Sequence, residues 1–576
     1  MNTAEYIIKR LEELDVNEFF GIPGHDNLNI LYIIKNNPNT KFIGCTNSLN
    51  AGYAANGYAR IKGYGALVTT YGAEELNSVN TIADSLADNV PVMHIVGLPA
   101  LNNRQKTYLD IYKQITGASA ILNRDNAKLE IDRAIKTMVR EKKPVYIGIP
   151  KDIALLPISD KTVSYDWISD KNILEELSAK IAEKIKNSKK PVIIGDTLIK
   201  RFDTELEYKE FVTKSGIPFS NFYTGINLAD MNSENYIGTY LGKYRNPIAQ
   251  KYIEESDCII TVGAIGNDTN PTIEMPFNID DHIAVYGNYT FFEGKKYDNI
   301  KMSEVLETVT NLIERMEIEI DKTNFGLKPQ DSSSEQLDCS YIFSRIQDFV
   351  KENDIIIADK GSIPFGLAQM KFPASTIVEM QSQNCSMGWA TPAILGVCMA
   401  KPQSRVILIT GDGAHTSTLN EVGTMLKNKI KPIAIVINNN GYTTQRYLCN
   451  DTQNDFNNTL NINFAKFARI FEGDVWSTQA NTKDDFDKAL KVTQIMNKMC
   501  YIEAITDSMD IPSLAKEVVS DTNIQTEKTD YTQNNENNVY NDIKDVVFDS
   551  KESGLEYETI VHKGIDEEMI NESEGE

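Results

Sequence analysis

The 576-residue sequence is poor in cysteine and has no long apolar run. Its seven cysteines are an odd number without a Cys-x-x-Cys pair, which argues against a disulfide framework and against a zinc site. No apolar stretch reaches the roughly 20 residues that a membrane-spanning helix needs, so we expect no membrane partner. The N-terminus lacks the basic and then apolar layout of a signal peptide. Together these absences predict a cytoplasmic protein.

The sequence is also short of positive charge. It has 58 lysines and arginines against 81 aspartates and glutamates, a formal net charge of −23, which argues against nucleic acid and anionic membranes as partners. Much of this excess is local, because residues 521–576 contain sixteen acidic residues and four lysines, a net charge of −12. This stretch is rich in Asn, Glu, Asp and Thr, and we expect a disordered acidic tail within which residues 539–548 can form one helix.

The rest of the chain has an ordinary globular composition, and its most informative stretch runs from residue 406 to residue 441. The apolar segments 406–409 and 432–437 are typical of buried strands, and residues 416–429 between them have the apolar spacing of a helix. Strand, helix and strand predict a βαβ unit. Asp412 and Asn439 then follow two parallel strands at the edge where open α/β sheets bind ligands.

These side chains have the chemistry of a magnesium site. A carboxylate, an amide oxygen and a loop carbonyl are hard ligands that suit Mg²⁺, which completes its octahedron with phosphate oxygens and water. The glycine-rich turn 411–413 exposes N–H groups, and the start of the following helix favours a diphosphate. The alternative is two unrelated turns, because Asp-Gly and Asn-Gly are common turn dipeptides. The fit of strand, helix and spacing to one site favours the magnesium interpretation.

The pattern Gly-Asp-Gly, 24 residues, Asn-Asn resembles the diphosphate-and-metal motif of thiamine diphosphate enzymes. The following Gly441-Tyr442-Thr443 is similar to the pyruvate decarboxylase and indolepyruvate decarboxylase branch. The resemblance extends from residue 1 to about residue 515. It implies thiamine diphosphate and Mg²⁺ as cofactors, and a homodimer or homotetramer.

The resemblance also implies the fold, an α/β class with three doubly wound parallel-sheet domains. These would be a pyrimidine-binding domain at residues 1–160, a central domain at 185–322 and a diphosphate- and magnesium-binding domain at 337–518, followed by the acidic tail at 521–576. The central domain shows no convincing dinucleotide fingerprint, so we expect an architectural role for it.

The cofactor-holding residues follow from the same resemblance. Asp412, Asn439 and the Gly441 carbonyl would hold Mg²⁺. Met387 would be the bulky residue that bends the cofactor, although the same methionine without the family would be interpreted as core filler. The Cys385 carbonyl would hold the aminopyrimidine. The other residues implied in cofactor binding are Gly361, Ser362, Gly413, Ala414, Tyr442 and Thr443.

The positions that handle protons depart from the family pattern. Ser48 stands where the family has a glutamate that hydrogen-bonds a pyrimidine nitrogen, and a serine hydroxyl cannot exchange a proton there near neutral pH. His25 replaces an aspartate, and its interpretations as a catalyst and as a hydrogen-bonded loop residue carry equal weight. Gln445 stands where the branch has a glutamate, and an amide cannot titrate. His25, Ser48 and Gln445 are the candidate catalytic residues.

Four further features of the sequence carry expectations. Glu74 replaces a glycine of the family's Thr-x-Gly-x-Gly-Glu loop, which is expected to narrow the site or restrict the backbone. Residues 101–121 resemble a shortened form of a loop that carries two adjacent histidines in the family, and they contain none. His415 is interpreted as a histidine at a helix start that contacts solvent or neighbours. The small residues of segment 47–60 predict close packing against another subunit.

Two functions are compatible with this sequence. The first is a thiamine diphosphate- and Mg²⁺-dependent lyase acting on 2-oxo acids, a non-oxidative decarboxylase or a carboligase whose atypical site lacks the usual glutamate. Its substrate would be a small 2-oxo acid or aldehyde, and the altered residues lean away from ordinary pyruvate decarboxylation. The alternative is a cofactor-binding pseudoenzyme or regulatory subunit that pairs with an active paralogue. The cofactor-holding residues are kept in both cases, so both predict cofactor binding.

Overall fold

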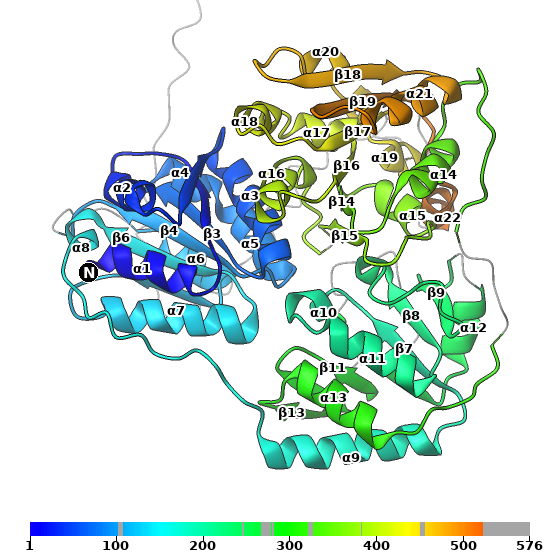
Figure 1. Ribbon diagram of the computed structural model, residues 1–576, viewed down its shortest axis with the longest axis horizontal. Coiled ribbons are helices and arrows are strands. Elements are labelled where there is room, and N and C mark those ends of the chain that lie inside the picture. Colours follow the sequence, from blue (N-terminus) through cyan, green and yellow to red (C-terminus); the bar gives the residue numbers. More distant parts are fainter. Residues whose placement is uncertain are drawn as a thin grey trace, which may run out of the picture. The chain divides into compact units, whose positions relative to one another are not determined.

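The computed structural model describes residues 1–101, 107–244, 247–265, 278, 281–320, 326–381, 383–449 and 455–521. These residues belong to one compact unit that contains three sheets, coloured blue to cyan, teal to green, and yellow-green to orange in Figure 1. Apart from Asp521, the predicted acidic tail and its helix at 539–548 lie outside the described residues. In the described part of the chain, no helix combines the length and the apolar character needed to cross a bilayer.

The first sheet is built entirely from parallel strands. Its strands are β1 (Glu18–Gly21), β2 (Lys41–Gly44), β3 (Gly65–Thr70), β4 (Val92–Leu98), β5 (Ala118–Ile121) and β6 (Val145–Pro150). The helices are α1 (Thr3–Glu12), α2 (Leu28–Asn36), α3 (Ser48–Lys62), α4 (Ala73–Asn77), α5 (Val79–Ala87), α6 (Leu109–Ile115), α7 (Ala127–Glu141) and α8 (Lys151–Ala154). The strand order is β2-β1-β3-β4-β6-β5. Strands β4 and β6 are buried at every residue, as parallel strands covered on both faces are expected to be.

The second sheet is parallel except at one edge. Its strands are β7 (Pro191–Gly195), β8 (Phe219–Phe222), β9 (Tyr236–Tyr240), β10 (Cys258–Val262), β11 (Ile283–Val285), β12 (Tyr289–Phe292) and β13 (Lys295–Asp298). The helices are α9 (Lys171–Asn187), α10 (Leu198–Arg201), α11 (Glu205–Ser215), the 3₁₀ helix η1 (Tyr223–Gly225), α12 (Pro247–Glu254) and α13 (Met302–Leu312). The order is β13-β12-β11-β10-β7-β8-β9, in which β11, β12 and β13 pair antiparallel.

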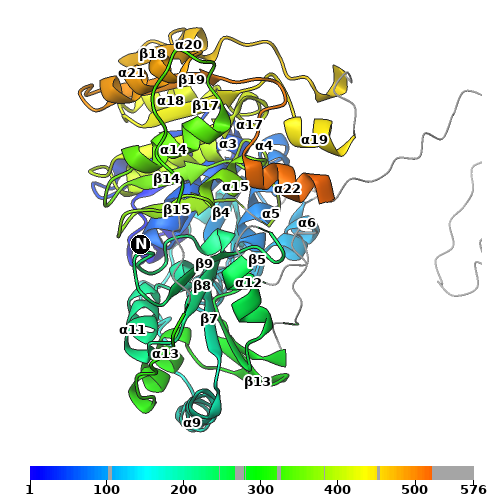
Figure 2. The same ribbon diagram turned by 90° about the vertical axis from the view of Figure 1, so that its right-hand side faces the viewer.

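The third sheet is again parallel throughout. Its strands are β14 (Ile355–Ala358), β15 (Ile377–Met380), β16 (Val406–Gly411), β17 (Ile433–Asn438), β18 (Val475–Ala480) and β19 (Met499–Ile505). The helices are α14 (Cys339–Phe349), α15 (Ile363–Leu367), α16 (Ala390–Ala400), α17 (Asp412–Thr416), α18 (Glu421–Lys427), α19 (Thr443–Leu448), the 3₁₀ helix η3 (Asp455–Asn457), α20 (Phe464–Phe467), α21 (Lys483–Thr493) and α22 (Ser513–Asp521). The order β15-β14-β16-β17-β19-β18 repeats that of the first sheet. Figure 2 shows α22 beside α15 and α19.

The predicted βαβ unit is present, but its single helix at 416–429 is wrong. The structure has two short helices there, α17 and α18. Between them the backbone forms tight turns, in which Ser417, Thr418 and Glu421 each donate to the carbonyl three residues earlier. The Thr418 hydroxyl also donates to the Gly388 carbonyl at 2.7 Å. These hydrogen bonds to backbone outside a helical ladder interrupt the helix that the apolar spacing predicts.

The small residues of α3 allow close packing against another helix of the same chain, and their packing against another subunit stays a prediction. Helix α3 packs against α16. A Cβ atom on Gly396 would lie 1.9 Å from the Ala54 carbonyl oxygen, and one on Gly57 would lie 2.2 Å from that of Ala393. The two helices therefore cross where each has a glycine, and this contact joins the first and third sheets.

Candidate cofactor site

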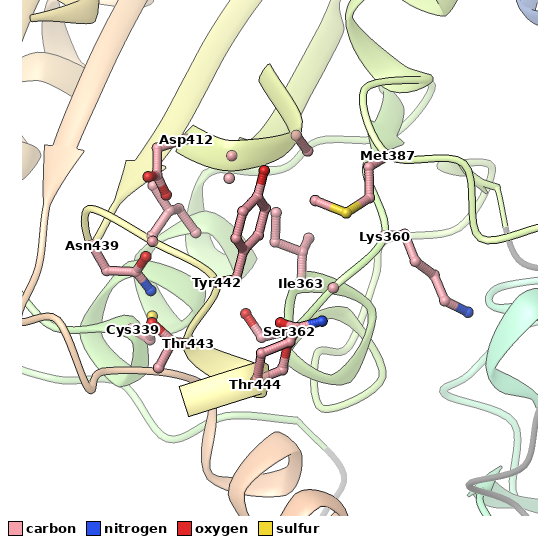
Figure 3. A pocket seen from close by; sticks show the side chains of 17 residues that line it. Cys339, Lys360, Ser362, Ile363, Met387, Asp412, Asn439, Tyr442, Thr443 and Thr444 are labelled. Atoms are coloured by element: carbon pink, nitrogen blue, oxygen red, sulfur yellow. Dashed lines mark hydrogen bonds between the residues drawn. The ribbon is translucent and has the colours of Figure 1, made fainter. Parts of the chain in front are cut away.

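A pocket lies at the carboxyl ends of strands β14, β16 and β17 (Figure 3). Strands β16 and β17 pair in parallel with Gly411 opposite Ile437, so the residues that follow the two strands are neighbours. The pocket brings together most of the predicted residues, from the four segments that follow β14, β15, β16 and β17. These are Gly361, Ser362, Met387, Asp412, Gly413, Ala414, Asn439, Gly441, Tyr442, Thr443 and Gln445.

Asp412 is the only carboxylate among the residues that line this pocket. It is 2% exposed, and its Oδ2 atom accepts a hydrogen bond from the Thr459 hydroxyl. Burial raises the pKa of Asp412, while the Thr459 hydroxyl and the backbone N–H groups of Gly413 and Asn439 act in the opposite direction. The one cationic side chain among the lining residues, Lys360, points its ammonium away from Asp412 in Figure 3, so this buried carboxylate is suited to a metal ion.

The Asn439 side chain is oriented by a backbone contact on its far side. Its Nδ2 atom donates to the Asp510 carbonyl at 3.3 Å. The amide oxygen is consequently turned toward Asp412, as Figure 3 shows. The Gly441 carbonyl accepts from the Thr443 N–H at 3.1 Å and retains a second lone pair. The three predicted magnesium ligands all line the pocket, Asp412 from the segment after β16 and Asn439 and Gly441 from the loop after β17.

Arg446 holds this loop in place. Its guanidinium donates to the carbonyls of Asn439 (3.3 Å), Asn440 (2.7 Å) and Ser508 (2.7 Å). It also donates to Asn458 Oδ1 at 2.7 Å and to the Thr443 hydroxyl at 3.3 Å. A Cβ on Gly441 would lie 2.1 Å from Arg446 Nη2, which explains a glycine at that position. The loop that carries Asn439 and Gly441 is therefore held by hydrogen bonds to one buried guanidinium, that of Arg446.

The pocket residues fit a magnesium-bound diphosphate. Gly361 has φ +107°, and a Cβ added at Gly361 or Gly411 would meet no atom within 4 Å, so the backbone is open to a ligand at both positions. In the described ranges no three His, Cys, Asp or Glu side chains form a metal cluster. One carboxylate, one amide oxygen and one carbonyl match an ion that takes its other ligands from phosphate and water. Met387, 40% exposed, lines the same pocket, as predicted for the bulky residue.

Three predicted residues do not line the pocket. Cys385 lies two residues before Met387, on the connection between β15 and α16, with φ 56°. His25 is exposed, with Nε2 3.3 Å from Lys151 Nζ. Ser48 is fully buried and its hydroxyl accepts from Asn77 Nδ2 at 3.2 Å. Their roles stay predictions, and Gln445, exposed at the pocket, accepts from the Thr444 hydroxyl at 2.7 Å.

Of the two contacts expected for His415, solvent or neighbours, the structure shows neighbours. His415 is fully buried, with Nδ1 2.7 Å from the Thr391 hydroxyl and Nε2 close to the Tyr501 hydroxyl at 2.5 Å. Burial lowers the pKa of His415 to about 3, so the ring is neutral near pH 7. It joins α16, α17 and β19 beneath the pocket and has the contacts of a structural residue.

Sequence reasoning missed the residues that orient the pocket side chains. Thr459, Arg446 and Asp510 have no fixed spacing from the Gly-Asp-Gly motif, and no local pattern marks them. Lys360, which lines the pocket, was not singled out either. Its ammonium points away from Asp412 in Figure 3 and lies 5.8 Å from the centroid of the Tyr223 ring.

Three family descriptions match the chain in the order of its three sheets. Residues 1–116 match the N-terminal TPP binding domain of thiamine pyrophosphate enzymes, residues 178–298 the central domain, and residues 359–504 the C-terminal TPP binding domain. The last match contains Asp412, Asn439 and Gly441.

Similar proteins match along nearly their whole length. A putative pyruvate decarboxylase of Schizosaccharomyces pombe is 28% identical over 554 residues, which cover 89% of this chain and 97% of that protein. A pyruvate decarboxylase of Kluyveromyces lactis is 28% identical over 542 residues, 88% of this chain and 96% of that protein. An alpha-keto-acid decarboxylase of Mycobacterium leprae is 29% identical over 538 residues, 88% and 93% of the two chains. With three matching domains and a pocket suited to their cofactor, the chain belongs to the thiamine pyrophosphate enzymes, in the decarboxylase branch, with Mg²⁺ as the usual partner of thiamine diphosphate.

Proposed function

We propose that this chain is a thiamine diphosphate- and Mg²⁺-dependent lyase acting on 2-oxo acids, as a non-oxidative decarboxylase or a carboligase. The observation that carries the proposal is the pocket edge at which Asp412, Asn439 and the Gly441 carbonyl lie together. The substrate class is supported by relatives named pyruvate decarboxylase and alpha-keto-acid decarboxylase. A small 2-oxo acid, or an aldehyde as the second reactant of a carboligase, is the proposed substrate.

In this proposal, the chain's residues bind and orient while the cofactor supplies the electron sink for cleavage beside a carbonyl. Asp412 and Asn439 present oxygen atoms to the ion, and Arg446 fixes the loop that carries them. Met387 supports the cofactor from the opposite wall of the pocket. Gln445 offers a hydrogen bond to a substrate oxygen without exchanging a proton, because an amide does not titrate near neutral pH.

We also propose that a second chain completes the site. The pocket is lined by residues between 339 and 445, all from the C-terminal domain. His25 and Ser48 follow strands β1 and β2 of the N-terminal domain and do not line it. A homodimer or homotetramer in which the N-terminal domain of one copy covers the pocket of another would join the two halves. Sedimentation with and without thiamine diphosphate and Mg²⁺ measures the assembly.

The first experiment combines cofactor affinity with product analysis. Magnesium-dependent binding of thiamine diphosphate is measured by calorimetry, and mixtures with a panel of 2-oxo acids are analysed by mass spectrometry and circular dichroism. We expect binding, and an aldehyde or hydroxyketone product, in the wild type and loss of both in Asp412→Ala. The matched control is Asp474→Ala, which removes a carboxylate that pairs with Lys498 at the surface of the same domain. A wild-type protein that binds no cofactor would overturn the proposal.

The alternative is a cofactor-binding pseudoenzyme or regulatory subunit that pairs with an active paralogue. The observation that favours it is that Ser48 and Gln445, two of the three candidate catalytic residues, have no titratable group. It predicts cofactor binding without turnover, and turnover in Ser48→Glu or in a mixed assembly with the paralogue. Turnover by the purified homo-oligomer excludes this alternative.

A further inference from the structure

A second cluster of side chains lies at the carboxyl ends of strands β1, β2 and β3. His25 follows β1, Ser48 begins the helix after β2, and Glu74 lies in the helix after β3. Strand β1 pairs in parallel with both β2 and β3, so these three connections meet at one edge of the N-terminal sheet. The hydrogen bond from the Asp26 N–H to the Thr70 hydroxyl at 3.4 Å joins two of them.

Glu74 and Glu75 are adjacent in the sequence but differ in their surroundings. Glu75 is fully buried, and its two oxygens accept from the Tyr146 hydroxyl at 2.7 Å and the Gly72 N–H at 3.4 Å. The Glu75 carboxylate is therefore held by hydrogen bonds within the fold. Glu74 is partly buried, and its Oε2 atom is buried without a hydrogen-bond partner in the described part of the chain. Buried carboxylate oxygens nearly always receive a donor, so this atom is suited to a ligand.

The position of Glu74 relates it directly to Ser48. Asn77 donates from Nδ2 to the Ser48 hydroxyl at 3.2 Å. Glu74 precedes Asn77 by three residues in helix α4, and side chains three apart share a helix face. The face that contacts Ser48 therefore also carries Glu74. At this edge of the sheet, the position of Ser48 carries no carboxylate. Glu74 carries one, in addition to the carboxylate of Glu75, whose oxygens are already hydrogen-bonded within the fold.

We propose that Glu74 provides the carboxyl group that is missing at Ser48, and that it hydrogen-bonds the pyrimidine ring of thiamine diphosphate. This inference rests on the proposed function, including the second chain that completes the site. Glu74 is then a catalytic residue in contact with the cofactor, and Asn77 positions Ser48 beside it. In this proposal the carboxyl group comes from the start of helix α4, whereas in the family it comes from the position of Ser48 at the start of helix α3.

The test measures hydrogen–deuterium exchange at C2 of the bound cofactor, which requires no substrate turnover. Full-length wild type and Glu74→Gln are loaded with thiamine diphosphate and Mg²⁺, mixed with deuterium oxide, quenched in acid and analysed by proton NMR. We expect Glu74→Gln to slow the exchange by at least about a hundredfold, the lower range for loss of acid–base assistance. The cofactor Kd, measured separately, is expected to change by less than about tenfold, because the diphosphate half of the site is untouched.

A relocation variant distinguishes a catalytic role from a structural one. Ser48→Glu combined with Glu74→Gln returns a carboxyl group to the edge from the neighbouring helix, and it is expected to recover most of the exchange rate. The matched control is Asp110→Asn, which neutralises an exposed carboxylate that pairs with Lys113 on helix α6. This control should exchange like the wild type.

The outcomes separate this inference from the proposed function. Normal cofactor binding with unchanged exchange in Glu74→Gln overturns the role of Glu74 and leaves the proposed function intact. Failure of the wild type to bind the cofactor overturns both. Slow exchange in Glu74→Gln that the relocation variant recovers, with both variants binding the cofactor, supports the inference and shows that both are folded.

Discussion

Hydrogen bonds to residues far away in the sequence help to orient the two side chains expected to bind the ion. Thr459 donates to Asp412, and the Asp510 carbonyl accepts from the Asn439 amide. Outer partners of this kind fix the direction in which a ligand atom points. Thr459 is 47 residues from Asp412 in the sequence, so its role appears only once the chain is folded.

Replacement of Thr459 tests this arrangement. Thr459→Val keeps the shape of the side chain and removes its donor, so the Asp412 carboxylate loses a fixed orientation. We expect the affinity for thiamine diphosphate in the presence of Mg²⁺ to fall by about 10–100-fold. Calorimetric titration measures it, with Thr478→Val as the control because the Thr478 hydroxyl donates to the Gln479 carbonyl near the surface, at 3.4 Å. Equal affinities in both variants would contradict the role of Thr459.

His415 gives the protein a predictable sensitivity to acid. Burial lowers the pKa of His415 to about 3, whereas an unfolded histidine has a pKa of about 6.5. Between these values the unfolded chain binds more protons than the folded chain, so the free energy of unfolding falls as the pH falls. The contribution of His415 is about 1.4 kcal/mol per pH unit below about pH 6.5.

The measurement is urea unfolding at pH 7 and pH 5 for the wild type and His415→Gln. The variant is expected to lose stability at pH 7 but to show a pH dependence smaller by about 2 kcal/mol over this interval. His94, whose pKa burial also lowers to about 3, provides an independent comparison through His94→Gln. If the free energy of unfolding depended on pH in both variants as it does in the wild type, the buried rings of His415 and His94 would not be neutral as we infer.

At the scale of elements, the contact between α3 and α16 depends on its glycines. Gly396→Ala places a Cβ atom 1.9 Å from a backbone oxygen of α3, so the two helices must separate. We expect a loss of about 1–3 kcal/mol in the free energy of unfolding, as for other overpacked contacts. Chemical denaturation measures the change.

The control for this contact is another helical glycine. For Gly423→Ala in α18, the three atoms nearest to the new Cβ all belong to the side chain of Phe471, the closest at 2.8 Å, and this side chain can move. An alanine also favours a helix by about 1 kcal/mol relative to glycine. We therefore expect Gly423→Ala to cost less than Gly396→Ala. The reverse order would show that the crossing of α3 and α16 is not tightly packed.

At the scale of the whole molecule, one carboxylate joins the three sheets. Glu379 of β15 pairs with Arg60 of α3 at 3.0 Å and with Arg201 and Lys200 of α10 at 2.7 and 3.4 Å. Burial by itself would raise the pKa of Glu379, but the charges of Arg201, Lys200 and Arg60 hold it well below its usual range. Its contribution to stability is complete above the unfolded pKa and is lost only as the pH falls through the much lower folded pKa.

Neutralising Glu379 tests this connection. Glu379→Gln leaves three cations around a neutral amide, and we expect a loss of about 3–5 kcal/mol in the free energy of unfolding. Asp298→Asn is the control, because its pair with Lys296 is exposed and is expected to contribute less than about 1 kcal/mol. Thermal unfolding of both variants at pH 7 measures the difference. Equal unfolding temperatures would contradict a structural role for the buried cluster.

The sequence predicted those parts of the protein that are determined by residues close together along the chain. Apolar runs predicted strands β16 and β17 to within two residues at either end, and the motifs after them predicted that Asp412 and Asn439 meet. Local patterns are sufficient there because parallel strands of one sheet end at a common edge. The same patterns failed at residues 416–429, where hydrogen bonds to distant backbone interrupt the helix.

Other features were decided only by the tertiary structure. Three features depend on groups brought together from distant segments. They are the burial of His415, the support of the loop after β17 by Arg446, and the Glu74 oxygen that has no partner among the described residues. The sequence does not indicate these features, because hydrogen bonds and burial depend on residues that are close in space, and no spacing along the chain predicts which residues these are. By itself the sequence therefore predicted the fold class and most of the residues that line the pocket, while packing decided which side chains are held in place by distant groups.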